Sequence, residues 1–256
     1  FLRGGAAALA DQASAQKWAG RLARELAARV GEATGRDYVV ALGSSGSECV
    51  EMALHHAVLE WRKKVERMEQ DDLQRFGGEG GGSLRDVWRR NREVLRSVPL
   101  RVITLENAFH GHTTGPRPLL GNEELREPFS NIAGLRRAPL DDRAPGWPAE
   151  LDRLLAEATV AIRRPVPGPG GPDFADFEVG TVVAAIAEPV VGEGGVRVVD
   201  REFLAALGRR EFPLIMDEVQ CGLGRTGTFL ASEGVRADYY VFGKALGGGV
   251  EKIAAL

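Results

Sequence analysis

The chain has 256 residues, 44% of them hydrophobic, which is enough for a substantial core in one large domain or two small ones. Its net charge of −3, the lack of a recognisable signal peptide and the lack of any apolar run near the roughly 20 residues of a membrane span argue against a nucleic-acid-binding or membrane protein. The two cysteines, Cys49 and Cys221, are too few for a disulfide scaffold and favour a reducing compartment, so the expected location is the cytoplasm.

A helix, a short strand and a second helix are expected before residue 69. Residues 6–30 carry apolar positions at helical spacing, and residues 1–37 are interpreted as an N-terminal helical segment. The short β-prone run Tyr38–Leu42 ends in a turn, GSSGS, where a long helix over about 47–68 begins.

Residues 69–98 are charged and contain a glycine-rich stretch, Gly77–Gly82. This composition is typical of a surface insertion, and a disordered surface loop is the favoured interpretation. A contact with a partner is the alternative.

Four more apolar runs follow, and each is expected to be a buried strand. They are Leu100–Leu105, Val182–Ala187, Pro213–Met216 and Tyr239–Phe242. Helices are expected between them over 148–161 and 201–210, and a Pro- and Gly-rich loop over 164–173. Buried apolar strands that alternate with helices predict an α/β fold with a mainly parallel sheet flanked by helices on both faces.

Polar or glycine-rich residues follow each apolar run at once. The five segments are GSSGSE, ENAFHGH, EPVVGEGG, DEVQCG and Gly243-Lys244. Because ligands bind at the carboxyl ends of strands in open α/β sheets, these segments are predicted to converge on one site.

Two nucleotide-binding interpretations of IMDEVQCGLGRTG (215–227) find little support. A phosphate-binding loop needs G-x-x-x-x-G-K-[ST], but the only Gly-Lys pair is followed by Ala245 and has Asp238 in place of the first glycine. Gly222–Gly227 matches the G-x-G-x-x-G of a dinucleotide loop, yet it neither leaves a strand directly nor opens a convincing helix.

A third interpretation pairs Asp217 with Lys244, which lie at the ends of neighbouring predicted strands. A lysine there can form a Schiff base with an aldehyde, and an acid can pair with a pyridinium nitrogen. Together they are the usual contacts of a protein with pyridoxal 5′-phosphate, the cofactor that we expect. No metal site is predicted.

Five motifs, in this order along the chain, resemble the class III (ω-amino-acid type) aminotransferases of fold type I. They are SGSECVEMA (45–53), NAFHGHT (107–113), AEPVVGEGG (187–195), DEVQCGLGRTG (217–227) and FGKALGGG (242–249). The resemblance implies that residues 38–256 form the cofactor-binding large domain, that the C-terminal small domain is absent, and that the protein is a homodimer.

The resemblance also implies roles for the first two motifs. Ser45, Gly46 and Ser47 would hold the cofactor phosphate at a helix N-terminus, where free N–H groups favour an anion; a simple helix cap is the alternative. Phe109 would stack on the cofactor ring, with His110 beside it.

For the later motifs, the resemblance implies that Glu188 supports the hydrogen bonds near the ring hydroxyl and that Gln220 binds this hydroxyl. Asp217 would keep the ring nitrogen protonated, so that the ring accepts electrons. Lys244 would hold the cofactor and then move the proton between the substrate carbon and the cofactor.

Two further residues concern the substrate. The family often has F-H-G-R-T where this chain has His112, so the arginine that can bind a substrate carboxylate is replaced by a side chain that is mostly neutral at pH 7. Glu193 matches a glutamate that gates substrate choice in ornithine-type members.

The expected activity is transamination from an ω-amino acid or diamine-like donor to an oxo acid by a ping-pong mechanism. Two alternatives stay open. The same scaffold suits an aminomutase or a decarboxylase, because the ring stabilises any carbanion next to the imine. A non-catalytic domain that keeps the fold for association is the other alternative.

Overall fold

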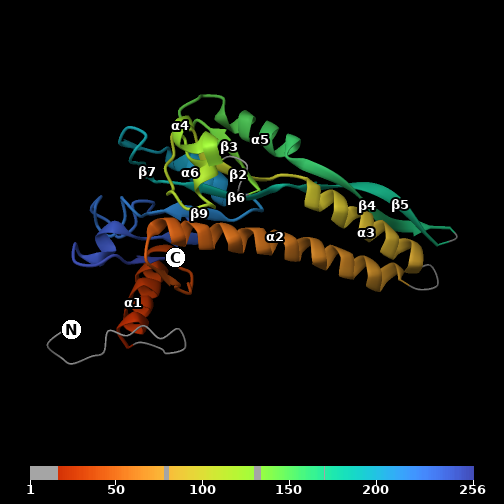
Figure 1. Cartoon of the computed structure of the whole chain (residues 1–256), viewed down its shortest axis with the longest axis horizontal. Helices are drawn as coiled ribbons and strands as arrows, with labels where there is room; N and C mark the ends of the chain where they lie inside the picture. Colours follow the sequence, from red (N-terminus) through yellow and green to blue (C-terminus); the bar gives the residue numbers. More distant parts are fainter. Residues whose placement is uncertain (1–16, 78–80, 130–133, 170) are drawn as a thin grey trace.

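The computed structural model describes residues 17–77, 81–129, 134–169 and 171–256. Its centre is a sheet of five parallel strands in the order β10–β9–β6–β2–β3 (Figure 1). These strands are β2 (Leu100–Leu105), β3 (Leu135–Leu140), β6 (Val182–Ala187), β9 (Leu214–Asp217) and β10 (Tyr239–Val241). The predicted α/β fold with a mainly parallel sheet is confirmed.

Helices contribute to the core on both faces of this sheet. They are α1 (Lys17–Thr34), α2 (Gly46–Phe76), α5 (Trp147–Glu157) and α6 (Arg201–Gly208). On one face, Leu54 of α2 and Val102 of β2 belong to the same buried cluster. On the other, Phe203 of α6 and Ile103 of β2 share a cluster to which α1 and α5 also contribute. Successive residues of a strand point to opposite faces, which explains why Val102 and Ile103 fall in different clusters.

The strands predicted at 100–105 and 182–187 are confirmed to the residue. β9 is shifted by one residue at both ends from the predicted 213–216, and β10 ends one residue before the predicted 242. The helices predicted over 148–161 and 201–210 correspond to α5 and α6. Strand β3 at the sheet edge has no counterpart among the predicted strands. Its sequence, LRRAPL, carries two arginines and a proline, which hide the alternation of its buried residues.

Two expectations about β-structure are wrong. The run Tyr38–Leu42 is not a strand of the main sheet, because only β1 (Leu42–Gly43) is a strand and it pairs antiparallel with β11 (Ala254–Ala255). The loop predicted over 164–173 lies instead in a hairpin of β4 (Thr159–Gly168) and β5 (Gly171–Gly180). Pairing across the hairpin stabilises an extended chain that its prolines and glycines alone do not predict.

The surface loop expected over 69–98 is also wrong for the described residues. Residues 69–76 continue α2, and α3 (Gly81–Ser97) follows. Helix α3 has buried residues at helical spacing, Leu84, Val87, Trp88, Asn91 and Leu95, so one face packs while the arginine-rich face meets solvent. The rest of the expected insertion, residues 78–80, lies outside the described residues.

We call residues 61–76 of α2, helix α3 and the β4–β5 hairpin the arm. The three parts run side by side away from the main sheet (Figure 1). They share a small apolar core that contains Val65, Leu84, Trp88 and Ile162. Polar ties add to it: Arg164 donates two hydrogen bonds of 2.7 and 3.0 Å to Asp72.

Replacing Asp72 with alanine is expected to destabilise the arm. The side chains of Asp72 and Arg164 are 6% and 23% exposed, so the variant leaves a largely buried guanidinium without its carboxylate. We expect a loss of about 2–3 kcal/mol, between the values for exposed and fully buried pairs. Urea unfolding followed by tryptophan fluorescence measures it. The exposed neighbour Asp71 is the matched control, and equal losses for Asp71→Ala and Asp72→Ala would contradict the assignment.

The remaining elements are short. They are η2 (Arg117–Leu119), α4 (Glu123–Arg126), η3 (Glu127–Phe129), β7 (Val190–Val191), β8 (Arg197–Val198) and η4 (Lys244–Gly247). Helix α1 begins at Lys17 and ends four residues beyond the predicted 30, and the first part of the predicted helix lies outside the described residues. Within the described ranges, no helix combines the length and the apolar character that crossing a lipid bilayer requires.

Candidate active site

A cavity of about 380 Å³ lies where the carboxyl ends of the parallel strands meet the start of α2. Each of the five polar segments predicted to converge contributes to its wall. The lining residues are Ser44–Ser47, Phe109–Gly111, Glu188, Asp217, Val219, Gln220, Lys244 and Glu251–Ile253. The convergence is therefore confirmed, although the first segment follows β1 rather than a strand of the main sheet.

The start of α2 forms one wall of the cavity. Ser45 caps the helix: its Oγ accepts from the N–H of Glu48, whose carboxylate accepts from the N–H groups of Ser44 and Ser45. The N–H groups of Gly46 and Ser47 have no partner among the described residues. A helix N-terminus with free N–H groups is a binding site for an anion such as phosphate.

Close contacts hold this helix start in place. A Cβ atom at Gly46 would come within 2.8 Å of Val219, so only glycine fits there. The Oγ atom of Ser47 accepts a hydrogen bond of 3.0 Å from the N–H of His112. Since that bond uses a lone pair, the hydroxyl proton of Ser47 stays available for an anion.

The floor of the cavity holds a buried pair, His110 and Asp217. His110 Nδ1 lies 2.8 Å from Asp217 Oδ2, and the side chains are 0% and 6% exposed. Asp217 Oδ1 accepts from the N–H of Val219 at 3.1 Å. A carboxylate only accepts, so Nδ1 of His110 is the donor in this bond. His110 Nε2 is buried without a partner in the described part of the chain.

Glu188 fastens the segment that carries Phe109. Its two oxygens accept from the N–H groups of Phe109 and Gly192 at 3.0 and 3.2 Å. Burial raises the pKa of Glu188 above its ordinary value, and the charge of Asp217 adds to this effect, although His110 opposes it. Glu188 therefore takes up a proton more readily than an exposed glutamate, which limits the negative charge beside Asp217.

Lys244 and Gln220 stand at the mouth of the cavity, and both side chains are exposed. Lys244 Nζ donates a hydrogen bond to Gln220 Oε1. The backbone of Lys244 has a φ of 41°, a left-handed conformation that is uncommon for residues other than glycine. Such backbone strain clusters at functional sites. Gln220 also packs on Gly192, where a Cβ atom would come within 2.6 Å of its amide.

Glu218 is not among the predicted site residues, yet its hydrogen bonds hold the strand end that carries Asp217 in place. It is buried, and its carboxylate accepts from Ala231 N, Ser232 N and Ser232 Oγ at 3.0, 2.9 and 2.6 Å. Burial raises its pKa above the ordinary value despite these bonds. Glu218 thus ties the strand end that carries Asp217 to the turn that follows Gly227. The sequence could have indicated this role, because Glu218 is adjacent to Asp217 and adjacent residues of a strand point to opposite sides.

His112 and Glu193 are both exposed, and neither belongs to the residues that line the cavity. The imidazole of His112 meets the ring of Phe109 edge-on, with centroids 5.1 Å apart. Their predicted roles in substrate binding stay predictions.

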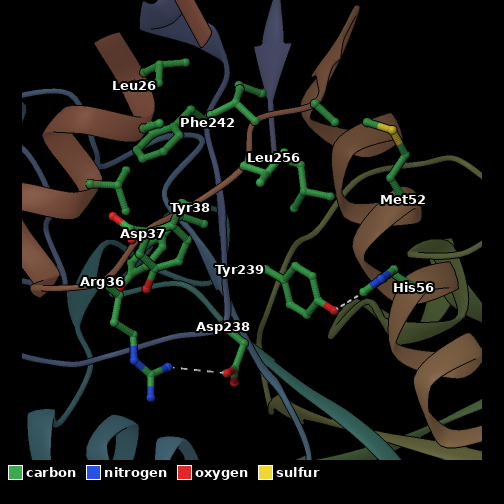
Figure 2. A pocket seen from close by; sticks show the side chains of 17 residues that line it. Leu26, Arg36, Asp37, Tyr38, Met52, His56, Asp238, Tyr239, Phe242 and Leu256 are labelled. Atoms are coloured by element: carbon green, nitrogen blue, oxygen red, sulfur yellow. Dashed lines mark hydrogen bonds and ion pairs between the residues drawn. The ribbon is translucent and has the colours of Figure 1, made fainter. Parts of the chain in front are cut away.

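A second cavity, of about 540 Å³, lies between α1, residues 36–41 and strand β10 (Figure 2). In its wall, Arg36 pairs with Asp238 and His56 with Tyr239. None of the predicted site residues lines it. Although it is larger, its wall lacks a combination of acid and free amine, so we place the chemistry in the 380 Å³ cavity.

The wall of the 380 Å³ cavity fits pyridoxal phosphate. It offers two free N–H groups for a phosphate, an amine for an aldehyde and a carboxylate for a pyridinium nitrogen, from Gly46, Ser47, Lys244 and Asp217. The volume is within the range of about 300–1,000 Å³ that is typical of small-molecule sites.

Two solved transaminases share this architecture. An amine transaminase from an uncultivated Pseudomonas species, in its pyridoxal-phosphate-bound form, superposes with a TM-score of 0.66 and 23% identity over 99% of this chain and 50% of that chain. An ornithine aminotransferase from Toxoplasma gondii gives a TM-score of 0.60 and 24% identity over 96% of this chain and 46% of that one. The fold is that of the fold-type I pyridoxal-phosphate-dependent transaminases.

Sequence comparison narrows this class to one family. The model of the class-III aminotransferases matches residues 8–256, so the chain belongs to that family. The acetylornithine aminotransferase of Methanocaldococcus jannaschii is 30% identical over 177 residues, which are 66% of this chain and 37% of that protein. The ornithine aminotransferase 1 of Staphylococcus aureus is 29% identical over 66% of this chain and 38% of its own length. The chain thus spans less than two fifths of the length of these relatives.

Proposed function

We propose that the protein is a pyridoxal-phosphate-dependent aminotransferase that moves an amino group from an ω-amino acid or diamine-like donor to an oxo acid by a ping-pong mechanism. The observation that carries this proposal is the position of Asp217 and Lys244. Asp217 is the last residue of β9, Lys244 follows the adjacent parallel strand β10, and both line the same cavity. Membership of the class-III aminotransferases supports it, as do the relatives named acetylornithine and ornithine aminotransferase.

When bound, the cofactor supplies an aldehyde for the substrate amine and a ring that accepts electrons from the substrate carbon. The residues of the chain hold and orient it. Gly46 and Ser47 would bind its phosphate through the start of α2, and Phe109 would stack on its ring. Asp217 would pair with the ring nitrogen and keep a proton there. His110 fixes the orientation of this carboxylate through its 2.8 Å bond.

Lys244 acts at the reacting atoms. Its Nζ is held by Gln220 at the mouth of the cavity, where an incoming amine meets it first. With the substrate amine bound, the free Nζ would take the proton from the substrate carbon and deliver it to the C4′ carbon of the cofactor. Gln220 keeps this amine within reach between the two steps.

Cofactor titration and a half-reaction test the proposal. Adding pyridoxal phosphate to the complete protein is expected to give a visible absorbance band, and borohydride treatment to fix the cofactor to the chain. A suitable donor amine without an oxo acid is expected to yield about one oxo product per site, because the second half of a ping-pong cycle needs the acceptor. A protein that stays colourless would refute the proposal and favour a non-catalytic domain.

A panel of amines with pyruvate or 2-oxoglutarate then defines the substrates. Turnover with an amine that needs no oxo acid would favour the aminomutase or decarboxylase instead. A strong preference for 2-oxoglutarate would show that His112 is no obstacle to an acceptor with two carboxylates. A homodimer and a cytoplasmic location belong to the same proposal; the family resemblance supports the first, and two free, buried cysteines agree with the second.

A further inference from the structure

We propose that Lys252 binds the phosphate group of the cofactor, an inference that rests on the proposed function. Lys252 lies outside the five motifs that carry the family resemblance. It nevertheless lines the 380 Å³ cavity together with its neighbours Glu251 and Ile253. Three features of the structure point to the phosphate: strand register, the charge of the wall and the state of the helix end.

The register of β1 and β11 brings Lys252 to the start of α2. The antiparallel pairs are Leu42 with Ala255 and Gly43 with Ala254. Two residues beyond these pairs lie Ser45, the N-cap of α2, on one segment and Lys252 on the other. Ser45 and Lys252 line the same cavity. We therefore place the ammonium group of Lys252 at the end of the cavity where the phosphate would bind.

The side chains that line the cavity carry more negative than positive charge, which favours a cation at the phosphate end. The described lining residues include three carboxylates, Glu188, Asp217 and Glu251, and only two cationic side chains, Lys244 and Lys252. Lys244 is reserved for the aldehyde end of the cofactor. Among the described residues, Lys252 has no carboxylate within ion-pair distance, so its charge is free for a ligand.

The helix end alone is a weak partner for a phosphate dianion. Two of its N–H groups, those of Ser44 and Ser45, already bind the carboxylate of Glu48. Two N–H groups remain, those of Gly46 and Ser47, and the negative charge of Glu48 lies next to them. A phosphate there gains from a nearby ammonium, which offsets this repulsion.

Comparing two ligands isolates the contribution of the phosphate group to binding. The apo form of the complete protein is titrated with pyridoxal phosphate and with pyridoxal, which has the same ring and aldehyde but no phosphate. Replacing Lys252 with methionine is expected to raise the Kd for pyridoxal phosphate roughly fivefold, the effect of about 1 kcal/mol for an exposed ion pair, and to leave the Kd for pyridoxal unchanged. Salt at about 1 M is expected to reduce the difference, because it screens exposed charges.

Two further variants serve as controls. Lys252→Arg keeps the charge and is expected to restore the Kd for pyridoxal phosphate. Glu251→Gln removes the neighbouring negative charge and is expected to lower that Kd. An unchanged Kd in Lys252→Met, an equal loss for both ligands, or a change confined to the KM of a substrate would overturn the inference. A wild-type protein that binds neither ligand would instead refute the proposed function.

Discussion

Replacing Lys244 with alanine is expected to lower turnover by about 10³-fold or more and to prevent covalent fixation of the cofactor. The amine is the only group at the reacting end of the cavity wall, in the described part of the chain, that can both hold an aldehyde and move a proton. General acid–base catalysis alone contributes about 10²- to 10⁴-fold, and the loss of covalent attachment adds to it. Mass spectrometry after borohydride treatment and the initial rate with a donor amine measure both effects.

Lys64→Ala is a suitable control for this variant. Lys64 lies on the arm, is about half exposed and pairs with Glu211 rather than with any residue of the cavity. The Lys64→Ala variant also removes a lysine side chain, but one outside the cavity. Turnover and covalent fixation of the cofactor should therefore match the wild type. If Lys244→Ala kept turnover within about tenfold of this control, Lys244 could not be the proton carrier, since that factor lies below the range for general acid–base catalysis.

The polar ends of the parallel strands could be predicted from the sequence because central strands of such a sheet are continuous apolar runs. β6 reads VVAAIA and is buried throughout, so its end at Glu188 is visible without a structure. A run that ends in Asp217 and another that ends near Lys244 follow the same rule. Since carboxyl ends of parallel strands meet at one edge of a sheet, their convergence follows from sequence alone.

The arm could not be predicted in the same way. The glycine-rich stretch and the arginines of α3 suggested a disordered loop by composition, although buried residues recur from Leu84 to Leu95 at helical spacing. The apolar stripe was the better signal, because amphipathic periodicity outweighs average polarity in a helix that packs on one side only. For the β4–β5 hairpin, the stabilising partners lie on α2 and α3, for example Asn91 for the backbone of Arg163.

Within the site, the sequence could identify residues but not their pairs. His110 and Asp217 are 107 positions apart, and only the fold brings their side chains together. The adjacent acids Asp217 and Glu218 also show what the sequence leaves open. Both acids are buried, but the alternation of a strand sends the first into the cavity and the second to Ser232 on the far side. Which acid faces the ligand depends on the register of β9.

Replacing Asp217 with asparagine is expected to lower turnover by about 10²- to 10³-fold while the cofactor still binds. The variant has nearly the same shape, but it removes the negative charge that would keep a proton on the ring nitrogen. A ring without that proton accepts electrons poorly. The phosphate and aldehyde contacts, which involve Gly46, Ser47 and Lys244, stay in place. The expected signature is therefore a fall in kcat with a small change in cofactor Kd.

The hydrogen bonds around Asp217 predict a second readout. The carboxylate accepts from both His110 Nδ1 and Val219 N, one bond on each oxygen. Asparagine has one oxygen, so if that oxygen keeps the bond to Val219, its amide must donate to His110 Nδ1. The proton of the imidazole then moves to Nε2. Nitrogen-15 NMR of the histidine side chains detects this change of tautomer. An unchanged tautomer would show that the amide of the new asparagine is flipped, so that its oxygen faces His110 Nδ1.

Asp238→Asn is the matched control. Asp238 directly precedes β10, at the opposite end of the strand from the cavity, and accepts a hydrogen bond of 2.9 Å from the N–H of Leu214. The same charge is removed from the same pair of strands, far from the ring nitrogen, so kcat should stay within about twofold, as for most surface substitutions. If Asp238→Asn and Asp217→Asn lowered kcat equally, the effect would come from the net charge of the domain. If neither did, the carboxylate of Asp217 would have no part in electron acceptance by the ring, and the assignment of β9 as the strand that serves the cofactor nitrogen would be wrong.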